Sequence, residues 1–379
     1  MKALLRAAGA ACTTLSLCAA SLCAAPVGAS ATDLVYGSWV SPKHSVMRTA
    51  MPGFFAEVAK QTKGEINWKM VAGGQLVDVK GTVPGLKDGL IDGGFVIAPF
   101  VPSYVPALNL VFSTQVFGDD TVASTGAMME FMLLKCPACA DEAKKAGIVE
   151  LGGFSTTPYV LMCRTPVATV ADMKGKKIRS IGGGVATMAL AGAVPVGMSP
   201  ADATQALQRG GLDCVHGPVS WLRSYGYQDV AKNVTDFPIG MSGPALHLTI
   251  SRKKFLAMTP QQRKAHVMAS PASVAASAID GYILNDRAII EAAKKKGVKF
   301  LKGGKDFADL TAKRDSQQRA GNIESSKKFN VPEPGKILDT FNETLAKWQK
   351  MSPGIGLDKS KFTEALMREV YSKVDPEKL

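Results

Sequence analysis

The sequence predicts an α/β protein in which two lobes are built on mostly parallel sheets. Short apolar segments typical of strands alternate with segments of helical periodicity along the whole chain. At 379 residues the chain is long enough to bury two cores. It has no internal repeat and no low-complexity linker. We therefore expect two lobes that the chain crosses several times, and not two tethered domains.

The N-terminal part of the chain alternates strands and helices in close succession. The pattern predicts a strand at 34–39, a helix at 44–62 with its apolar side chains on one face, and a strand at 65–71. A helix that closes at 86–91 leads into a third strand at 95–97. This order is typical of a sheet whose strands are joined by helical crossovers.

The later part of the chain carries clear helix-start signals. Ser199 opens a predicted helix, and Gly210 ends it. Residues 259–262 have the pattern of a capping box. Helical periodicity continues from there to residue 297, with an interruption expected at Pro271 because proline has no amide hydrogen to donate.

The predicted elements divide into two lobes and a set of C-terminal helices. We expect one crossing between the lobes near 153–159 and a second near 244–251, where the chain would act as a hinge. The predicted division is lobe I at 32–155, completed by part of 246–300; lobe II at 156–245; a helical segment at 260–297; and C-terminal helices at 298–379.

The first 31 residues have the composition of a secretory signal peptide. Lys2 and Arg6 give a basic start, residues 7–23 carry no charge, and small residues precede a predicted cleavage site before Thr32. This apolar segment is rich in alanine and lies at the terminus, so it is interpreted as removed and not as membrane-spanning. We therefore expect a soluble, exported protein that is not itself embedded in the membrane.

The chain is basic, which favours anionic partners through long-range steering. Because Lys2 and Arg6 are the only charged residues in 1–31, removal of this segment lowers the net charge from +13 to +11. Most of the excess is interpreted as solubilising surface charge. Export from the cytoplasm argues against nucleic acid as the partner.

Four cysteines remain after the signal segment is removed: Cys136, Cys139, Cys163 and Cys214. An even number in an oxidising compartment indicates disulfides. Cys136 and Cys139 form a C-P-A-C motif, interpreted as a structural local disulfide in preference to a redox centre, because an apolar helical run at 128–134 precedes it and not a strand. Cys163 and Cys214 are candidates for a second bridge. The sequence predicts no metal site and no cofactor.

A strand that ends in arginine and runs into three glycines is the most informative feature of the chain. Arg179 closes this strand, and Gly182, Gly183 and Gly184 lead into a predicted helix at 185–193. A guanidinium group offers a planar fork of donors that matches both oxygens of a carboxylate. Glycines let the backbone approach a ligand, and the helix start adds a positive end. The alternative is a structural arginine beside an ordinary turn.

The segments around Arg179 resemble the solute-binding proteins of TRAP transporters, the DctP-like family. The resemblance rests on "KGKKIR" at 174–179 and "ALQRGGLD" at 206–213, with weaker support from "GGQL" at 73–76, and it extends from about residue 34 to about residue 350. It implies a periplasmic-binding-protein-like type II fold, with a ligand cleft between the lobes, hinge crossings and a long bridging helix at 260–297. It also implies that Arg179 clamps a substrate carboxylate and that small and large TRAP membrane subunits are the partners.

Ligands of such sheets bind at the carboxyl ends of strands, which nominates further cleft residues. The candidates are Trp39, Gln75, Ile97, Phe100, Tyr159, Arg179, Gly183, His216 and Trp221. Trp39 and Trp221 have packing as their alternative role. His216 is interpreted either as a donor to a keto or hydroxyl oxygen or as a structural histidine.

Departures from the family pattern shape the predicted specificity. Compared with the sialic-acid-binding members, Tyr159 replaces a second arginine and Ile97 an acidic contact, while Arg164 lies out of register. The resemblance therefore indicates a monocarboxylate with an apolar or aromatic body, packed by Ile97, Phe100, Tyr104, Tyr159 and Trp221. A C4-dicarboxylate is the family default.

The sequence offers little for catalysis. It contains no G-x-S-x-G motif, and its four histidines show no metal-binding spacing. We therefore expect a receptor and not an enzyme. Two alternatives remain, namely the solute-binding protein of an ABC importer and a secreted thiol-disulfide oxidoreductase that uses Cys136 and Cys139.

Overall fold

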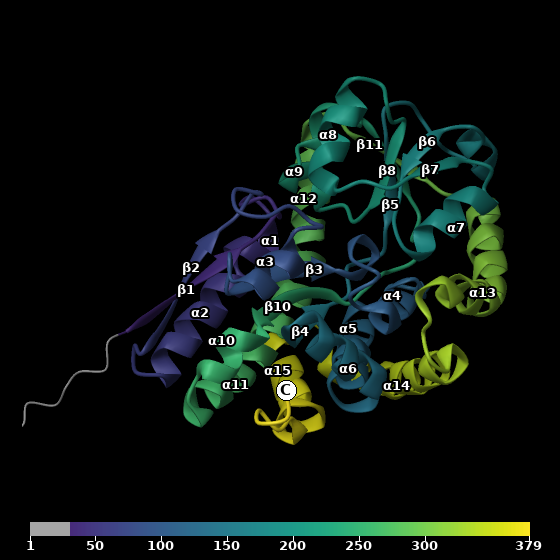
Figure 1. Ribbon diagram of the computed structural model, residues 1–379. Helices are drawn as coiled ribbons and strands as arrows, with labels where there is room; N and C mark the ends of the chain where they lie inside the picture. The colour runs from purple at the N-terminus through teal and green to yellow at the C-terminus, as the bar shows by residue number, and fades with distance from the viewer. Residues whose placement is uncertain (1–30) are drawn as a thin grey trace, which may run out of the picture. The chain divides into compact units, whose positions relative to one another are not determined.

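The computed structural model describes residues 31–379, which fold into two sheets with helices around them (Figure 1). The predicted signal segment lies outside the described residues except for Ala31. The two-lobed α/β fold expected from the sequence is confirmed.

The first sheet contains five strands in the order β2-β1-β3-β10-β4. Strand β1 runs parallel to β2 and β3, whereas β10 runs antiparallel to β3 and β4. The strands are β1 (Thr32–Gly37), β2 (Ile66–Val71), β3 (Gly93–Ile97), β4 (Ile148–Phe154) and β10 (Ala245–Ser251).

The second sheet contains six strands in the order β11-β9-β5-β8-β6-β7. Strand β5 runs antiparallel to both β8 and β9, and the other neighbours are parallel. The strands are β5 (Val160–Cys163), β6 (Lys177–Arg179), β7 (Val194–Val196), β8 (Cys214–Gly217), β9 (Asn233–Asp236) and β11 (Lys299–Lys302).

Each sheet contains one antiparallel strand, β10 in the first and β5 in the second, and its other strands all run in one direction, so the expectation of mostly parallel sheets is confirmed. The antiparallel strands β5 and β10 are the ones that the chain enters directly from the other sheet. A strand reached in this way is not the product of a β-α-β crossover, and its direction is not set by one.

The two faces of the second sheet pack against separate apolar clusters. Along β5, Val160 and Met162 belong to one cluster, while Leu161 and Cys163 belong to the other. This alternation follows from the period of two in a strand. A third and larger cluster surrounds the first sheet.

Helices cover the sheets, and most of their boundaries agree with the sequence signals. Ser199 and Thr259 cap their helices as expected, the latter in a capping box. Around the first sheet lie α1 (Ser45–Arg48), α2 (Ala50–Gln61), α3 (Thr82–Asp88), α4 (Pro106–Phe112), α5 (Thr121–Glu130), α6 (Pro137–Ala146) and α10 (Arg252–Ala257). The second sheet carries α7 (Gly183–Leu190), α8 (Pro200–Gln208) and α9 (Trp221–Ser224).

One long helical stretch connects the two cores. It consists of α11 (Pro260–Ala276), a π-helical segment (Ser277–Leu284) and α12 (Asn285–Lys295). Val274 and Tyr282 pack in the core of the first sheet, whereas Ile289 packs in a core of the second. The stretch is apolar and long enough to pass for a membrane span, but 67% of its most apolar window is buried inside the protein.

The expected interruption at Pro271 was wrong. Pro271 lies inside α11, and the irregular segment begins later, at Ser277. Proline removes one hydrogen bond of the helix, but α11 is buried along most of its length, and this packing holds the helical path through Pro271.

The crossings between the sheets lie where strands of one sheet end and those of the other begin. Residues 155–159 join β4 to β5, within the range expected for the first crossing. The second crossing occupies 237–244, earlier than expected, because residues 245–251 form the fully buried strand β10. The backbone of this strand is hydrogen-bonded to β3 and β4, so these residues cannot serve as a connection between the sheets.

The C-terminal helices contact both lobes. Helix α13 (Lys305–Ser326) runs beside α7, and its Phe307 packs in a core of the second sheet (Figure 1). Helices α14 (Pro334–Ile355) and α15 (Lys359–Glu369) pack on the first core through Trp348 and Phe362.

Candidate functional site

A small cavity lies between the two sheets, beside Arg179. Its volume is about 30 Å³, room for about two water molecules. Residues of both lobes line it: Trp39, Val40, His44, Phe95, Ile97, Phe100, Phe112, Thr156, Tyr159, Arg179, Ile181, Pro200, Trp221, Tyr225, Ser242, Ala245 and Tyr282. Arg179 is the only lysine, arginine, aspartate or glutamate among them.

The local sequence places Arg179 at the carboxyl end of β6, next to the first lobe. Gly182 follows with a φ of +55°, and a Cβ atom there would lie 2.9 Å from the Phe112 ring. At Gly183, a Cβ atom would collide with the carbonyl oxygen of Ser113. These two glycines therefore allow the strand end to pack closely against the end of α4 in the other lobe.

Arg179 is fully buried, and among residues 31–379 it has no acidic partner. Its Nε donates to the Met198 carbonyl at 2.9 Å, and Nη1 lies 3.4 Å from the His216 carbonyl. Within residues 31–379, Nη2 has no hydrogen-bond partner. Burial lowers the pKa of Arg179 below its usual value, but a guanidinium group remains charged at neutral pH. A buried charge that leaves a hydrogen-bond donor without an acceptor destabilises the folded state unless an anion binds to it.

Aromatic side chains surround the guanidinium group. The Trp221 ring lies against it, with the guanidinium carbon 5.0 Å from the ring centroid. Tyr159 and Tyr225 flank the indole at centroid distances of 6.0 and 5.7 Å. The Nε1 of Trp221 is buried and has no partner among the described residues. The arrangement attracts an anion electrostatically and offers an apolar surface for its body.

The first lobe supplies the opposite wall. Trp39 is fixed by a hydrogen bond from its Nε1 to the Phe95 carbonyl at 2.8 Å. Its ring meets Phe95 and Phe100 edge-on, at 5.7 and 6.5 Å between centroids. Because the Trp39 donor is already used, this residue contributes apolar surface to the cavity.

A polar pair lies in the same cavity, at His44 and Tyr282. The Nε2 of His44 is 3.1 Å from the Tyr282 hydroxyl. His44 also caps α1, because its Nδ1 accepts the Val46 amide hydrogen at 3.3 Å. Burial lowers the pKa of His44 to about 4, so the ring is neutral at physiological pH.

Six of the nine candidate residues line this cavity: Trp39, Ile97, Phe100, Tyr159, Arg179 and Trp221. Gln75 is exposed and donates to the Ala72 carbonyl at 3.2 Å. Gly183 packs against Ser113 instead. His216 is fully buried behind Tyr159, 3.0 Å from the Ser180 hydroxyl. Burial, and then the charge of Arg179, lower the pKa of His216 to about 3.

Sequence reasoning missed several residues of the cavity, above all Tyr225 and Tyr282. Tyr282 lies in the π-helical segment, where the usual helical periodicity does not predict which face a side chain occupies. Arg164 is exposed and Tyr104 half-buried, and neither lines the cavity.

Both predicted disulfides are present, Cys136–Cys139 and Cys163–Cys214. Cys136 caps α6, so the C-P-A-C motif stands at a helix start, and it follows a helical run and not a strand, as the sequence indicated. The preceding helical run does not exclude a helix start, because α5 ends in a π-helical turn (Phe131–Lys135) and a new helix begins at Pro137.

Within residues 31–379, no group of three or more His, Cys, Asp or Glu side chains is placed to hold a metal ion. The cavity joins one buried cation to aromatic walls from two lobes. These features define a two-lobed protein whose cavity between the sheets is suited to a small anion.

Comparison with known proteins identifies the family. Residues 36–309 match the model of the DctP family, described as bacterial extracellular solute-binding protein, family 7, and the chain belongs to this family. The resemblance to TRAP solute-binding proteins is thereby confirmed.

Individual relatives are distant. The 2,3-diketo-L-gulonate-binding periplasmic protein YiaO of Escherichia coli is 24% identical over 294 residues, which cover 75% of this chain and 84% of that protein. Another curated relative is matched over 66% of its own length.

Solved structures show the same fold. A TRAP solute-binding protein of Rhodoferax ferrireducens in complex with benzoate superposes with a TM-score of 0.73 and 20% sequence identity. The match covers 84% of this chain and 99% of the Rhodoferax protein. One from Bordetella bronchiseptica with bound (R)- and (S)-mandelate has a TM-score of 0.70 and 21% identity, and covers 85% and 100%.

Proposed function

We propose that this protein is the periplasmic receptor that captures an organic monocarboxylate and delivers it to a TRAP-type membrane transporter. The observation that carries the proposal is the Nη2 of Arg179, which is fully buried beside the cavity and has no hydrogen-bond partner among residues 31–379. A carboxylate there would accept hydrogen bonds from the guanidinium group, including its Nη2, and would neutralise its charge.

The walls of the cavity favour a ligand with an apolar or aromatic body. Trp39, Phe100 and Trp221 offer ring faces and edges, and among residues 31–379 no second lysine or arginine lines the cavity. A C4-dicarboxylate would leave its other carboxylate buried without a countercharge, which is unfavourable. The family relatives with bound benzoate and mandelate lend support, because both ligands are aromatic monocarboxylates.

Capture requires movement of the lobes. A cavity of about 30 Å³ holds about two water molecules, too little for an organic acid. The ligand would therefore enter an open form, and the lobes would close over Arg179 by bending at 155–159, at 237–244 and in the π-helical segment. Release would follow docking on the membrane subunits.

A ligand screen tests this proposal. The mature chain, residues 32–379, is unfolded, washed free of co-purified ligand and refolded, and its melting temperature is measured with aliphatic, aromatic, hydroxy, keto and dicarboxylic acids. A monocarboxylate should raise the melting temperature of the wild-type protein and not of Arg179→Ala. A response to dicarboxylates alone would overturn the proposed specificity, and no response to any acid would overturn the receptor function. Neighbouring genes for small and large TRAP membrane subunits would exclude the ABC importer.

A further inference from the structure

The hydrogen-bonding pattern of His44 determines which of its nitrogens carries the proton. A backbone amide can only donate, so the Val46 N–H requires a lone pair on His44 Nδ1. In the neutral ring the proton therefore resides on Nε2. Nε2–H then donates to the Tyr282 hydroxyl oxygen, 3.1 Å away.

This assignment leaves Tyr282 with its own proton to donate. Its oxygen accepts from His44, and the structure gives the hydroxyl no acceptor among residues 31–379. Tyr282 is 3% exposed and held by packing against Phe154, with the ring centroids 5.0 Å apart. The hydroxyl therefore cannot turn to bulk solvent for a partner.

The other unmet polar groups of the cavity are also donors. They are the Nη2 of Arg179 and the Nε1 of Trp221, both without partners in the described part of the chain. Burial of unmet donors is costly, so the cavity is suited to a ligand rich in acceptor oxygens. One carboxylate on Arg179 leaves the Tyr282 donor unused.

Tyr282 and Arg179 approach the cavity from different lobes. Tyr282 and its partner His44 are held by the first lobe, because Tyr282 packs in the core around the first sheet and His44 caps α1. Arg179 ends a strand of the second sheet. A ligand that accepts from both would therefore join the two lobes.

We propose that Tyr282, oriented by His44, donates a hydrogen bond to a second acceptor oxygen of the bound monocarboxylate, remote from the carboxylate on Arg179. The ligand class is an acid with a carbonyl, ether or hydroxyl oxygen on an otherwise apolar body. This inference rests on the proposed function, because the carboxylate must first be placed by Arg179. Tyr282 is then a specificity-determining residue, and His44 is its positioning residue.

The test uses pairs of acids that differ in one oxygen. Calorimetric titration compares hexanoate with 2-oxo-, 4-oxo- and 5-oxohexanoate, and 4-ethylbenzoate with 4-methoxybenzoate. For the wild-type protein, at least one oxygen-bearing acid should bind roughly tenfold more tightly than its counterpart, as expected for one buried hydrogen bond. In Tyr282→Phe, the ratio of the affinities for the two acids of that pair should fall to about one.

Two further variants distinguish the role of the Tyr282 hydroxyl from an unspecific loss of binding. His44→Asn keeps a side chain that can cap α1 but is too short to reach Tyr282, so it should also reduce the ratio. Tyr104→Phe removes a hydroxyl outside the cavity and should keep the wild-type ratio. Binding of hexanoate or 4-ethylbenzoate shows that each variant is folded.

The possible outcomes are distinct. One result is that the acids bind with an affinity ratio that is unchanged in Tyr282→Phe, and another is that the wild-type protein prefers no oxygen-bearing acid. Either result overturns the role of Tyr282 and leaves the receptor function in place. If no acid binds to the wild-type protein, the proposed function fails, and this inference fails with it.

Discussion

The guanidinium group of Arg179 lies against the indole of Trp221, with its central carbon 5.0 Å from the ring centroid. The two residues come from the end of β6 and the start of α9. The indole covers one face of the cation and stabilises it without neutralising it, so its charge remains available to a ligand.

Replacing Arg179 tests this arrangement. Arg179→Ala should weaken binding of the best acid by at least roughly a hundredfold, because the charge-assisted contact is lost. Arg179→Lys should weaken it by at least roughly tenfold, because an ammonium group lacks the planar fork. Calorimetric titration measures both. The control is Arg164→Ala, an exposed arginine outside the cavity, which should bind as the wild type does. Wild-type affinity in Arg179→Lys would show that charge alone, and not the fork, selects the ligand.

The two disulfides should differ in their contribution to stability. Cys163 and Cys214 are 51 residues apart and sit opposite each other on β5 and β8, whereas Cys136 and Cys139 are separated by 3. In the chain-entropy model, removal of the long bridge costs about 4 kcal/mol and removal of the short one about 2 kcal/mol.

Urea unfolding of Cys163→Ala/Cys214→Ala and Cys136→Ala/Cys139→Ala measures this difference. Neither pair lines the cavity, so both double variants should bind the same acids while folded. A larger loss for the Cys136–Cys139 pair would contradict the ranking. Rapid, reversible exchange of that bridge with a dithiol would instead favour the redox alternative.

Local signals predicted the part of the site that lies close to a strand end. Arg179 and Trp221 each follow or close a strand of the second sheet, so the rule for carboxyl ends was sufficient to nominate them. The same rule nominated Gln75, which is exposed, because it does not say how far a loop turns away from the cleft.

Long-range pairing lay beyond sequence reasoning. His44 and its partner Tyr282 are 238 positions apart, and Tyr282 lies in the π-helical segment. The second crossing was misplaced for a related reason. A short apolar run such as β10 is equally compatible with a strand or a buried connection until its neighbours in the sheet are known.

A buried glutamate should make stability fall with rising pH. Glu150 on β4 is 6% exposed, and its Oε1 has no partner among residues 31–379. Burial, reinforced by the charge of Glu142, raises the pKa of Glu150 to about 8. The folded state therefore keeps a proton that the unfolded chain releases above its ordinary pKa of about 4.3. Stability from this group is complete below that value and is lost as the pH rises towards about 8.

Glu150→Gln removes this titration while keeping the shape of the side chain. Between pH 5.5 and 8.5, the wild-type free energy of unfolding should fall relative to that of the variant by at least about 1 kcal/mol. Urea unfolding at both pH values measures the difference, in which the contributions of the buried histidines cancel. Glu57→Gln, at a partly exposed glutamate on α2, is the control, and its free energy of unfolding should change with pH as that of the wild type does. Parallel profiles for the wild type and Glu150→Gln would show that Glu150 is already ionised in the folded protein.

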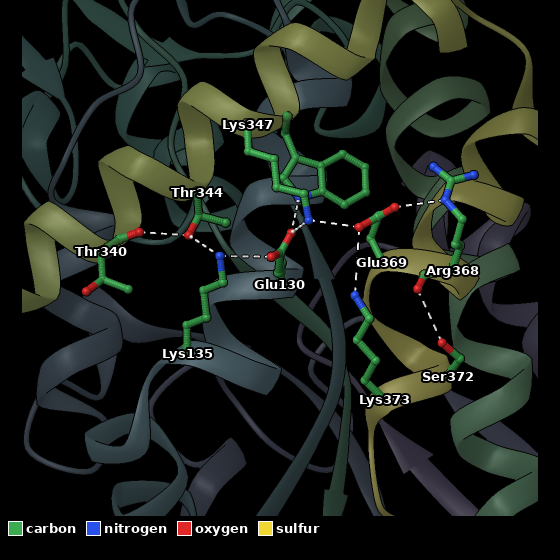
Figure 2. Close-up of polar contacts among 10 residues, drawn as sticks. Glu130, Lys135, Thr340, Thr344, Lys347, Arg368, Glu369, Ser372 and Lys373 are labelled. Atoms are coloured by element: carbon green, nitrogen blue, oxygen red, sulfur yellow. Dashed lines mark hydrogen bonds and ion pairs between the residues drawn. The ribbon is translucent and has the colours of Figure 1, made fainter.

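The last prediction concerns the ion-pair network that joins α5 to the C-terminal helices (Figure 2). Glu130 is 4% exposed and accepts from Lys347 at 2.8 Å and from the Trp348 indole at 2.7 Å. Lys135 contacts its other oxygen at 2.9 Å. Lys347 also reaches Glu369 on α15, at 2.9 Å. Lys347 therefore ties three helices to one another.

Acidification should weaken this network. Hydrogen bonds from Lys347 and Arg368 lower the pKa of Glu369 to about 2. Burial alone would raise the pKa of Glu130, but hydrogen bonds from Lys347, Lys135 and Trp348 lower it below its usual value. Both carboxylates thus stabilise the fold above their ordinary pKa, and this stability is lost as the pH falls towards about 2.

Lys347→Met keeps the apolar stem of the side chain and removes its charge, and it should lower the free energy of unfolding at pH 7 by about 1–3 kcal/mol, because buried Glu130 loses a charged hydrogen bond. The deficit should shrink between pH 5 and pH 2.5, since protonated carboxylates gain little from the lysine. Lys294→Met, in the exposed pair with Glu291, should cost less than about 1 kcal/mol. A deficit of Lys347→Met that stays constant down to pH 2.5 would attribute its effect to packing of the stem and not to the ion pairs.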